Sequence, residues 1–205
     1  DNASFQIDGT TLQAAESFDH ESKSNYSIRV RSTDNQSNEL ESAFSVTIQD
    51  VNEAPTNLNL SNHIVNENKA ESTSIGSLST TDVDDGDAFV YSFSNGDGDT
   101  DNELFSIQND GELFSTTSFD FETKENYTVR IKSTDQAGAN VESSFAIGVL
   151  DVNDTPTAVQ LSNSDLNENN AIDDIIGIFS SIDQDSGDSH SYNLTAGTGD
   201  EDNEN

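Results

Sequence analysis

The chain repeats itself at a fixed offset of 101 residues. The block Asp-Val-Asn-Glu-Ala-Pro at 50–55 returns at 151–156 as Asp-Val-Asn-Asp-Thr-Pro. Four further pairs of blocks keep the same register: 18–21 with 119–122, 29–34 with 130–135, 66–68 with 167–169, and 82–84 with 183–185. Several matching blocks in one order identify a tandem repeat, in which each unit is one structural module.

The offset divides the chain into one whole unit and two partial units. Residues 55–155 span a complete unit, residues 1–54 match its C-terminal half, and residues 156–205 match its N-terminal half. The chain has no methionine and no signal-like start, so we expect it to be a piece of a longer protein. Each half alone would expose an apolar face and unpaired strand edges, which pairing between chains would cover.

The hydrophobic residues within each unit alternate with polar ones. This alternation is clearest at 26–30, 44–48, 127–131 and 145–149, and it is typical of half-buried strands. Clusters of Asp, Asn, Gly and Ser separate five further expected strands, at 57–61, 74–80, 88–94, 104–107 and 112–118. Seven short strands in about 100 residues, without a crossover helix, predict an all-β fold of tandem seven-stranded Greek-key β-sandwiches.

The charge of the chain limits its partners. Asp and Glu number 40 against 7 Lys and Arg, which gives a formal net charge of −33. Such a chain repels the phosphate backbone, so we expect no binding to nucleic acid. No apolar run approaches the roughly 18–20 residues of a membrane span, so we expect no membrane insertion by this segment. The absence of cysteine excludes disulfides, thiolate metal sites and a cysteine nucleophile.

The carboxylates gather in the repeated blocks rather than along the strands. Asp82 and Asp84 are two positions apart, as are Asp120 and Glu122, so each pair points the same way in an extended segment. Like charges that are held together cost free energy without a counter-ion. Carboxylate, amide and carbonyl oxygens in such numbers favour calcium over magnesium, which prefers fewer protein ligands and more water.

Other chemistries find less support in the sequence. The acidic run 97–101 begins like an EF-hand loop, but its twelfth position is Gln108 rather than glutamate. No nucleophile elbow, phosphate loop or catalytic triad is present, and we expect no enzyme. The histidines share no metal-ligand spacing, and we expect them in solvent rather than in a zinc or catalytic site: His20, His63 and His190.

Taken together, the repeated blocks resemble the cadherin repeat, whose β-sandwich is immunoglobulin-like. The family's front Glu matches Glu67 and Glu168, and its strand-end Asp matches Asp34 and Asp135. Its paired acids match Asp82/Asp84, Asp183/Asp185, Asp19/Glu21 and Asp120/Glu122, and its linker matches 50–55 and 151–156. Glu53 replaces the usual linker Asp, and both linkers reach Pro one residue early. The short, cysteine-free style resembles tandem repeats of large bacterial surface or secreted adhesins.

The resemblance implies that calcium binds between units. The first junction would collect seven carboxylates and one amide: Asp19, Glu21, Asp50, Asn52, Glu53, Asp82, Asp84 and Asp135. The second would collect Glu67, Asp120, Glu122, Asp151, Asn153, Asp154, Asp183 and Asp185. Several divalent ions would offset this charge, and the linker would stiffen when they bind.

The implied function is a calcium-binding, calcium-stiffened segment of a secreted or cell-surface protein, with a membrane-anchored parent chain. It would mediate cell adhesion, homophilic adhesion included, or act as an extended spacer. The alternative is a carbohydrate- or matrix-binding module on a larger extracellular enzyme. A glycosidase-like carboxylate pair is a third possibility, and the repetition of the acids argues against it. The expected partners are calcium ions, neighbouring repeats, other copies of the chain and cell-surface carbohydrate.

Overall fold

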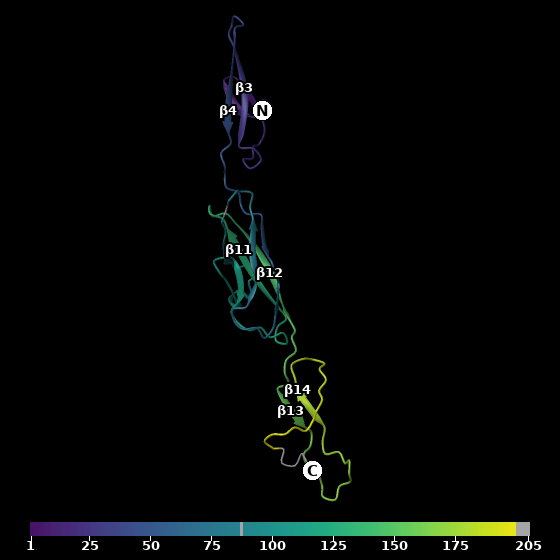
Figure 1. Ribbon diagram of the computed structural model, residues 1–205. Coiled ribbons are helices and arrows are strands. Elements are labelled where there is room, and N and C mark those ends of the chain that lie inside the picture. The colour runs from purple at the N-terminus through teal and green to yellow at the C-terminus, as the bar shows by residue number, and fades with distance from the viewer. Residues whose placement is uncertain (87, 200–205) are drawn as a thin grey trace.

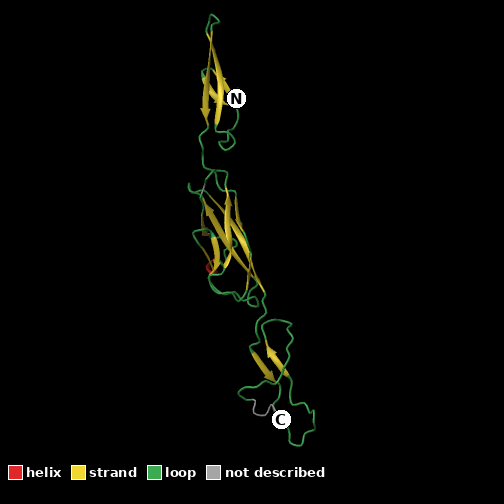
Figure 2. Ribbon diagram, in the orientation of Figure 1, coloured by secondary structure: helices red, strands yellow, loops and turns green. Residues whose placement is uncertain are grey.

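The computed structural model describes residues 1–86 and 88–199, in which three β-rich units follow one another in a row (Figure 1). Strands form the regular structure of each unit, although loops make up most of the third, and the helical content described is two single turns of 3-10 helix, at Asn2–Ser4 and Asn102–Leu104 (Figure 2). Within 1–86 and 88–199, no helix is long and apolar enough to cross a membrane.

The middle unit is a sandwich of two four-stranded sheets. One sheet has the order β5-β7-β10-β9, and the other has the order β6-β12-β11-β8. Their bounds are β5 (Asn57–Leu60), β6 (Ile64–Asn66), β7 (Ser74–Thr81), β8 (Val90–Phe93), β9 (Phe105–Ile107), β10 (Glu112–Ser115), β11 (Asn126–Thr134) and β12 (Asn140–Leu150). All pairs are antiparallel except β6 with β12, which run parallel. The expected all-β sandwich is confirmed.

One strand was missing from the sequence prediction. The first strand of the middle unit crosses from one sheet to the other after β5, and its second part, β6, pairs with β12. Asn62 fixes this crossing, because its side-chain amide donates to the carbonyl oxygens of Ile64 and Ile75, each at 2.7 Å. Gly76 gives the crossing room: a Cβ there would lie 2.9 Å from the backbone nitrogen of Asn62.

The first unit contains counterparts of β9 to β12, and the described part of the third unit contains counterparts of β5 and β7 but not of β6 and β8. The first unit has β1 (Phe5–Asp8) paired with β2 (Thr11–Ala14), and β3 (Asn25–Thr33) paired with β4 (Glu39–Thr47). The third unit has β13 (Ala158–Leu161) paired with β14 (Phe179–Ile182). The long hairpin β3–β4 keeps the register of β11–β12, since Tyr26 faces Val46 as Tyr127 faces Ile147.

The hydrophobic core lies in the middle unit. Alternate residues of β11 point between the sheets, and Val129 and Ile131 are fully buried there. Leu113 and Ile147 pack into the same core from β10 and β12, and both are also fully buried. The predicted alternation of inward apolar residues is therefore present. The packed core holds the strands in place, and the acidic loops begin where these strands end.

Candidate metal centre

The first junction lies between the first and middle units, at the point where four loops meet. The linker after β4 runs past the segment before β3, and it approaches the loops that follow β7 and β11 (Figure 1). Glu21, Asp50, Glu53 and Asp84 each offer a carboxylate oxygen, and these oxygens all lie within 4.8 Å of one another. Four acids from both units thus converge, as one cation would require.

The environment of Glu53 shows the electrostatic cost of this convergence. Burial, followed by the charges of Asp84 and Glu21, raises the pKa of the Glu53 carboxyl above its ordinary value. Its backbone N–H donates to Asp84 Oδ2 at 3.0 Å, which ties the linker to the loop after β7. Glu53, which replaces the usual linker Asp, therefore lies among the other acids.

Buried carboxylate oxygens without partners provide a test of whether a cation fits. Asp82 Oδ2 and Asp84 Oδ1 are shielded from solvent, and neither has a hydrogen-bond partner among the described residues. A buried charged oxygen without compensation is strongly unfavourable. A hard cation with oxygen ligands supplies that compensation, so the donor set at this junction fits calcium.

Asn52 and Asp135 bridge the first junction directly. The Asn52 side-chain amide donates to Asp135 Oδ2 at 3.0 Å and to the carbonyl oxygen of Glu53 at 2.6 Å. The bond from Asn52 lowers the pKa of Asp135, burial raises it, and the backbone N–H groups of Gly138 and Ala139 lower it again. The net result is a pKa below the ordinary value. Asp135 therefore keeps its charge at the junction.

Asp19 and Asp120 are held by local turns in equivalent positions. Asp19 accepts from the backbone N–H and the hydroxyl of Ser22, at 3.1 and 2.8 Å. Asp120 accepts in the same way from Thr123, at 3.0 Å for both bonds. These bonds lower the pKa of both carboxyls and fix their direction. Neither residue belongs to the closest carboxylate groups, although both lie in the segments that carry Glu21 and Glu122.

The second junction is organised around a buried glutamate. Glu67 is 1% exposed, and its two oxygens accept from the backbone N–H groups of Val152, at 2.7 Å, and Phe121, at 2.8 Å. One of its oxygens lies within 4.8 Å of a carboxylate oxygen from Glu122 and from Asp151. Glu67, which follows β6 beside the end of β12, thus ties the linker to the loop that contains Phe121.

The acids of the third unit complete the second junction. Asp185 Oδ2 accepts from the backbone N–H of Asp154 at 2.6 Å, in parallel with Asp84 and Glu53 at the first junction. Burial, followed by the charges of Asp185 and Glu67, raises the pKa of the Asp151 carboxyl. Burial also raises the pKa of Glu122, and the charges of Glu67, Asp151 and Asp185 add to this effect.

Asp183 repeats the unpartnered oxygen of the first junction. Its side chain is 5% exposed, and its Oδ2 has no hydrogen-bond partner among residues 1–86 and 88–199. Asn153 donates its amide to the carbonyl oxygen of Asp154 at 2.5 Å, which leaves its side-chain oxygen as the atom able to meet a cation. The second donor set therefore also fits calcium.

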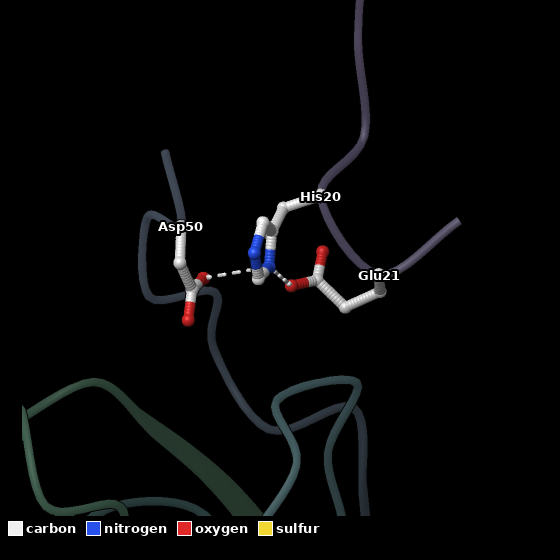
Figure 3. A group of neighbouring side chains, drawn as sticks. All are labelled: His20, Glu21 and Asp50. Atoms are coloured by element: carbon white, nitrogen blue, oxygen red, sulfur yellow. Dashed lines mark hydrogen bonds and ion pairs between the residues drawn. The ribbon is translucent and has the colours of Figure 1, made fainter. Parts of the chain in front are cut away.

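The structure corrects the expectation for two histidines. The His20 side chain is 34% exposed, and its Nδ1 lies 3.0 Å from Glu21 Oε1 (Figure 3). The His190 side chain is 22% exposed and lies 3.8 Å from Asp183 Oδ2. Both belong to the acidic junctions, because the negative charge there attracts an imidazole. His63 is exposed as expected.

Sequence reasoning missed several supporting residues at the junctions. Asn68 donates to Asp154 Oδ1 at 2.8 Å, and Gln184 lies 3.4 Å from Asp120 Oδ2. Ser22 and Thr123 could have been found, since each follows its aspartate by three positions in both repeats. Asn68 and Gln184 lie within repeated blocks, but they meet acids from a distant part of the chain, and the blocks do not report these contacts.

Comparison with known proteins identifies the family. The cadherin domain model matches residues 62–152. Mouse Protocadherin Fat 4 is 29% identical over 206 residues, which cover 96% of this chain and 4% of that protein. Mouse Cadherin-8 is 30% identical over 217 residues, which cover 95% of this chain and 26% of that protein. The chain therefore spans only a small part of these relatives.

Solved structures show the same architecture. The Protocadherin GammaB4 extracellular domain matches with a TM-score of 0.65 and 26% identity, over 86% of this chain and 29% of that one. A protocadherin gammaB7 fragment of repeats EC3-6 matches in fold with a TM-score of 0.61 and 22% identity, over 91% of this chain and 47% of that one. The chain belongs to the cadherin repeat family and carries a cadherin domain at residues 62–152.

Proposed function

We propose that this chain is a calcium-stiffened segment of an extracellular or cell-surface adhesion protein. The observation that carries the proposal is the set of buried carboxylate oxygens that have no hydrogen-bond partner among the described residues: Asp82 Oδ2, Asp84 Oδ1 and Asp183 Oδ2. Calcium would satisfy these oxygens and neutralise the acids around them. The sixteen junction residues predicted from the sequence are the proposed ligand set and its immediate support.

The stiffening follows from which units contribute ligands. At the first junction, Glu21 and Asp50 belong to the first unit and its linker, whereas Asp84 belongs to the middle unit. An ion bound by all three would hold the ends of two units and the linker together. Without the ion, the same carboxylates repel one another, and the linker is free to bend. We propose that the repeat boundaries at 54/55 and 155/156 are the hinges.

Adhesion is the role that the family supports, and the position of the segment in its parent protein decides whether it contacts a partner or acts as a spacer. The cadherins and protocadherins that match it are proteins with extracellular repeats. The neighbouring repeats of the same chain are its first partners, and other copies of the protein are candidates for homophilic contact.

The aromatic residues that the structure describes do not favour the carbohydrate-binding alternative. Phe179 and Tyr192 form an exposed stacked pair, with ring centroids 5.3 Å apart. At the repeat offset these positions correspond to Leu78 and Tyr91, which pack in or against the core of the middle sandwich. The pair is therefore explained as core-forming residues rather than as a sugar platform.

Small-angle X-ray scattering of the full chain tests the proposed stiffening. Profiles are recorded in millimolar calcium, in the same concentration of magnesium, and in chelator. We expect calcium alone to give the profile of a straight rod and to raise the melting temperature. A chain with D50A and D151A together keeps its strands and serves as the matched control. Identical profiles and melting temperatures in calcium and in chelator would overturn the proposal.

A further inference from the structure

At the first junction an imidazole joins two carboxylates in one group, whereas His190 at the second junction lies 3.8 Å from Asp183 and belongs to no such group among the described residues. His20 corresponds at the repeat offset to Phe121, which packs against the core of the middle unit. His20 instead turns toward two carboxylates, and its Nδ1 lies 3.0 Å from Glu21 Oε1 and 3.8 Å from Asp50 Oδ1 (Figure 3). At this repeat position the first junction therefore has an imidazole and the second has a phenyl ring.

The three groups have the spacing of ligands around one small cation. The ligand atoms of His20, Glu21 and Asp50 all lie within 4.8 Å of one another. Zinc binds nitrogen and oxygen ligands at about 2.0–2.1 Å in tetrahedral geometry, which places neighbouring ligand atoms about 3.3 Å apart. The observed separations of 3.0 and 3.8 Å lie on either side of this value.

The surroundings leave a place for a fourth ligand. His20, Glu21 and Asp50 line one open hollow together with Ser24, Val83 and Asp85. The Asp50 side chain is 57% exposed, so a cation and a water molecule can reach the site from solvent. Three protein ligands and one water are the usual arrangement of an open zinc site.

An unpartnered oxygen at the same junction points independently to a cation. Glu21 and Asp50 also belong to the group that contains Asp84, whose buried Oδ1 has no partner among the described residues. The imidazole nitrogen changes which cation is preferred, because imidazole suits zinc, copper or nickel, whereas calcium takes oxygen ligands. Glu21 and Asp50 would be shared between the two sites.

We propose that the first junction, and not the second, binds a transition-metal dication of the Zn²⁺ class through His20 Nδ1, Glu21 and Asp50. The site goes beyond the proposed calcium function, although it rests on the same carboxylates at Glu21 and Asp50. Zinc at this position withdraws two ligands from calcium, so the two ions compete at the first junction while the second junction responds to calcium alone.

The test is zinc binding to the full chain after chelator treatment and dialysis. Zn²⁺ is titrated calorimetrically near pH 7.5 in 0.15 M salt with excess Mg²⁺, which occupies the exposed acids. Long-range ¹H–¹⁵N spectra of the imidazoles report the binding residue. We expect one Zn²⁺ per chain, a shift of the His20 Nδ1 resonance, and loss of this binding event in H20F. H63F and H190F are the matched controls and are expected to keep it.

Calcium titration of H20F separates this inference from the proposed function. Phenylalanine is the residue of the second repeat at this position, so we expect H20F to fold and to bind calcium as the unchanged chain does. Zinc binding that persists in H20F, or that is lost in H190F instead, overturns the zinc site. A chain that binds calcium but no zinc overturns only this inference, whereas a chain that binds neither overturns the proposed function as well.

Discussion

The two junctions share a linker pattern but differ in the burial and the contacts of their acidic residues. At the second junction Glu67 is 1% exposed and already accepts two backbone hydrogen bonds, one of them from the linker residue Val152. At the first junction the Asp50 side chain is 57% exposed, and a histidine fills the position next to it. Two linkers of similar sequence therefore lie in candidate metal sites with different surroundings.

The difference indicates where preorganisation comes from. Glu67 directly follows β6 beside the end of β12, and its carboxylate ties the linker at Val152 to the loop that contains Phe121. It thereby braces the second junction before any ion binds. Among the described residues 1–86 and 88–199, no buried glutamate makes equivalent contacts at the first junction, so in this 205-residue segment more of the order there must come from the cation. We expect calcium to bind more tightly at the second junction, because less has to be ordered on binding.

The largest effect should come from breaking the sandwich that both junctions share. Val129→Asp places an unpaired charge at a fully buried position of β11, and we expect it to lower the free energy of unfolding by more than about 4 kcal/mol. Both junctions should then lose calcium binding. Val90→Asp lies on β8 of the same sheet, is 69% exposed, and is the control. Chemical denaturation of both variants in calcium measures the difference; equal stability would contradict the core assignment.

Removal of the brace should affect one junction only. Glu67→Ala leaves the N–H groups of Phe121 and Val152 without their acceptor, and we expect a loss of about 2–4 kcal/mol of stability in calcium. The matched control is Glu168→Ala, because Glu168 is the exposed counterpart of Glu67 in the third unit. Thermal melts and calcium titrations report both effects. A Glu67→Ala chain as stable as the Glu168→Ala chain would show that Glu67 is no brace.

The sequence predicted most of the fold because its strands are local patterns. The alternation around Tyr127–Ile131 and Phe145–Val149 marked β11 and β12, and the inward positions are buried as expected. β6 was missed because three residues, Ile64–Asn66, are too short to show alternation, and their pairing with β12 is non-local.

The candidate site residues were predicted from repeated blocks rather than from the local alternation that marked the strands. The offset pairs equivalent acids, and the resemblance of the repeated blocks to the cadherin repeat implied their grouping into two junctions. The turn of His20 toward Asp50, by contrast, depends on how the linker passes the preceding segment, and no spacing in the sequence reports that contact. Partners from distant loops, such as Gln184 at Asp120, were hidden for the same reason.

Equivalent linker acids should sharpen the comparison further. Asp50→Ala and Asp151→Ala remove the same ligand from the two junctions, and we expect each to weaken calcium binding at its own junction by about tenfold or more, since ligand charge sets affinity. Asp151→Ala should cost more, because the second junction is the better ordered. Calcium titration of each single variant, with its unaltered junction as internal reference, measures this. Equal losses at both junctions would contradict the proposed role of Glu67.

The smallest effect, and one with a distinctive sign, is that of pH. Burial and neighbouring charges raise the pKa of Glu53, Glu122 and Asp151, so the folded chain without calcium binds protons more readily than the unfolded chain. Stability in chelator should therefore fall as pH rises from about 4, the ordinary carboxyl pKa, through the raised folded values.

Acidification from pH 7 to about 5 should thus raise the melting temperature in chelator. In calcium the sign reverses, because protons compete with the ion for the same carboxylates. Below about pH 4 the lowered pKa values of Asp19, Asp120 and Asp135 turn the trend in chelator downward. Melting curves across this range, with and without calcium, check both signs; the same slope in both series would contradict the assignment.

Equilibrium dialysis of the full chain against radioactive calcium measures the central claim most directly, with the D50A/D151A double variant alongside and 0.15 M salt and magnesium present throughout. We predict saturable binding at the unaltered junctions with a dissociation constant of roughly 10⁻⁴–10⁻³ M, as in other extracellular calcium modules, and a large loss of bound calcium in the double variant. Calcium uptake that rises without saturation, and equally in both chains, would mean that the acids act only as a diffuse negative surface and that the junctions are not calcium sites.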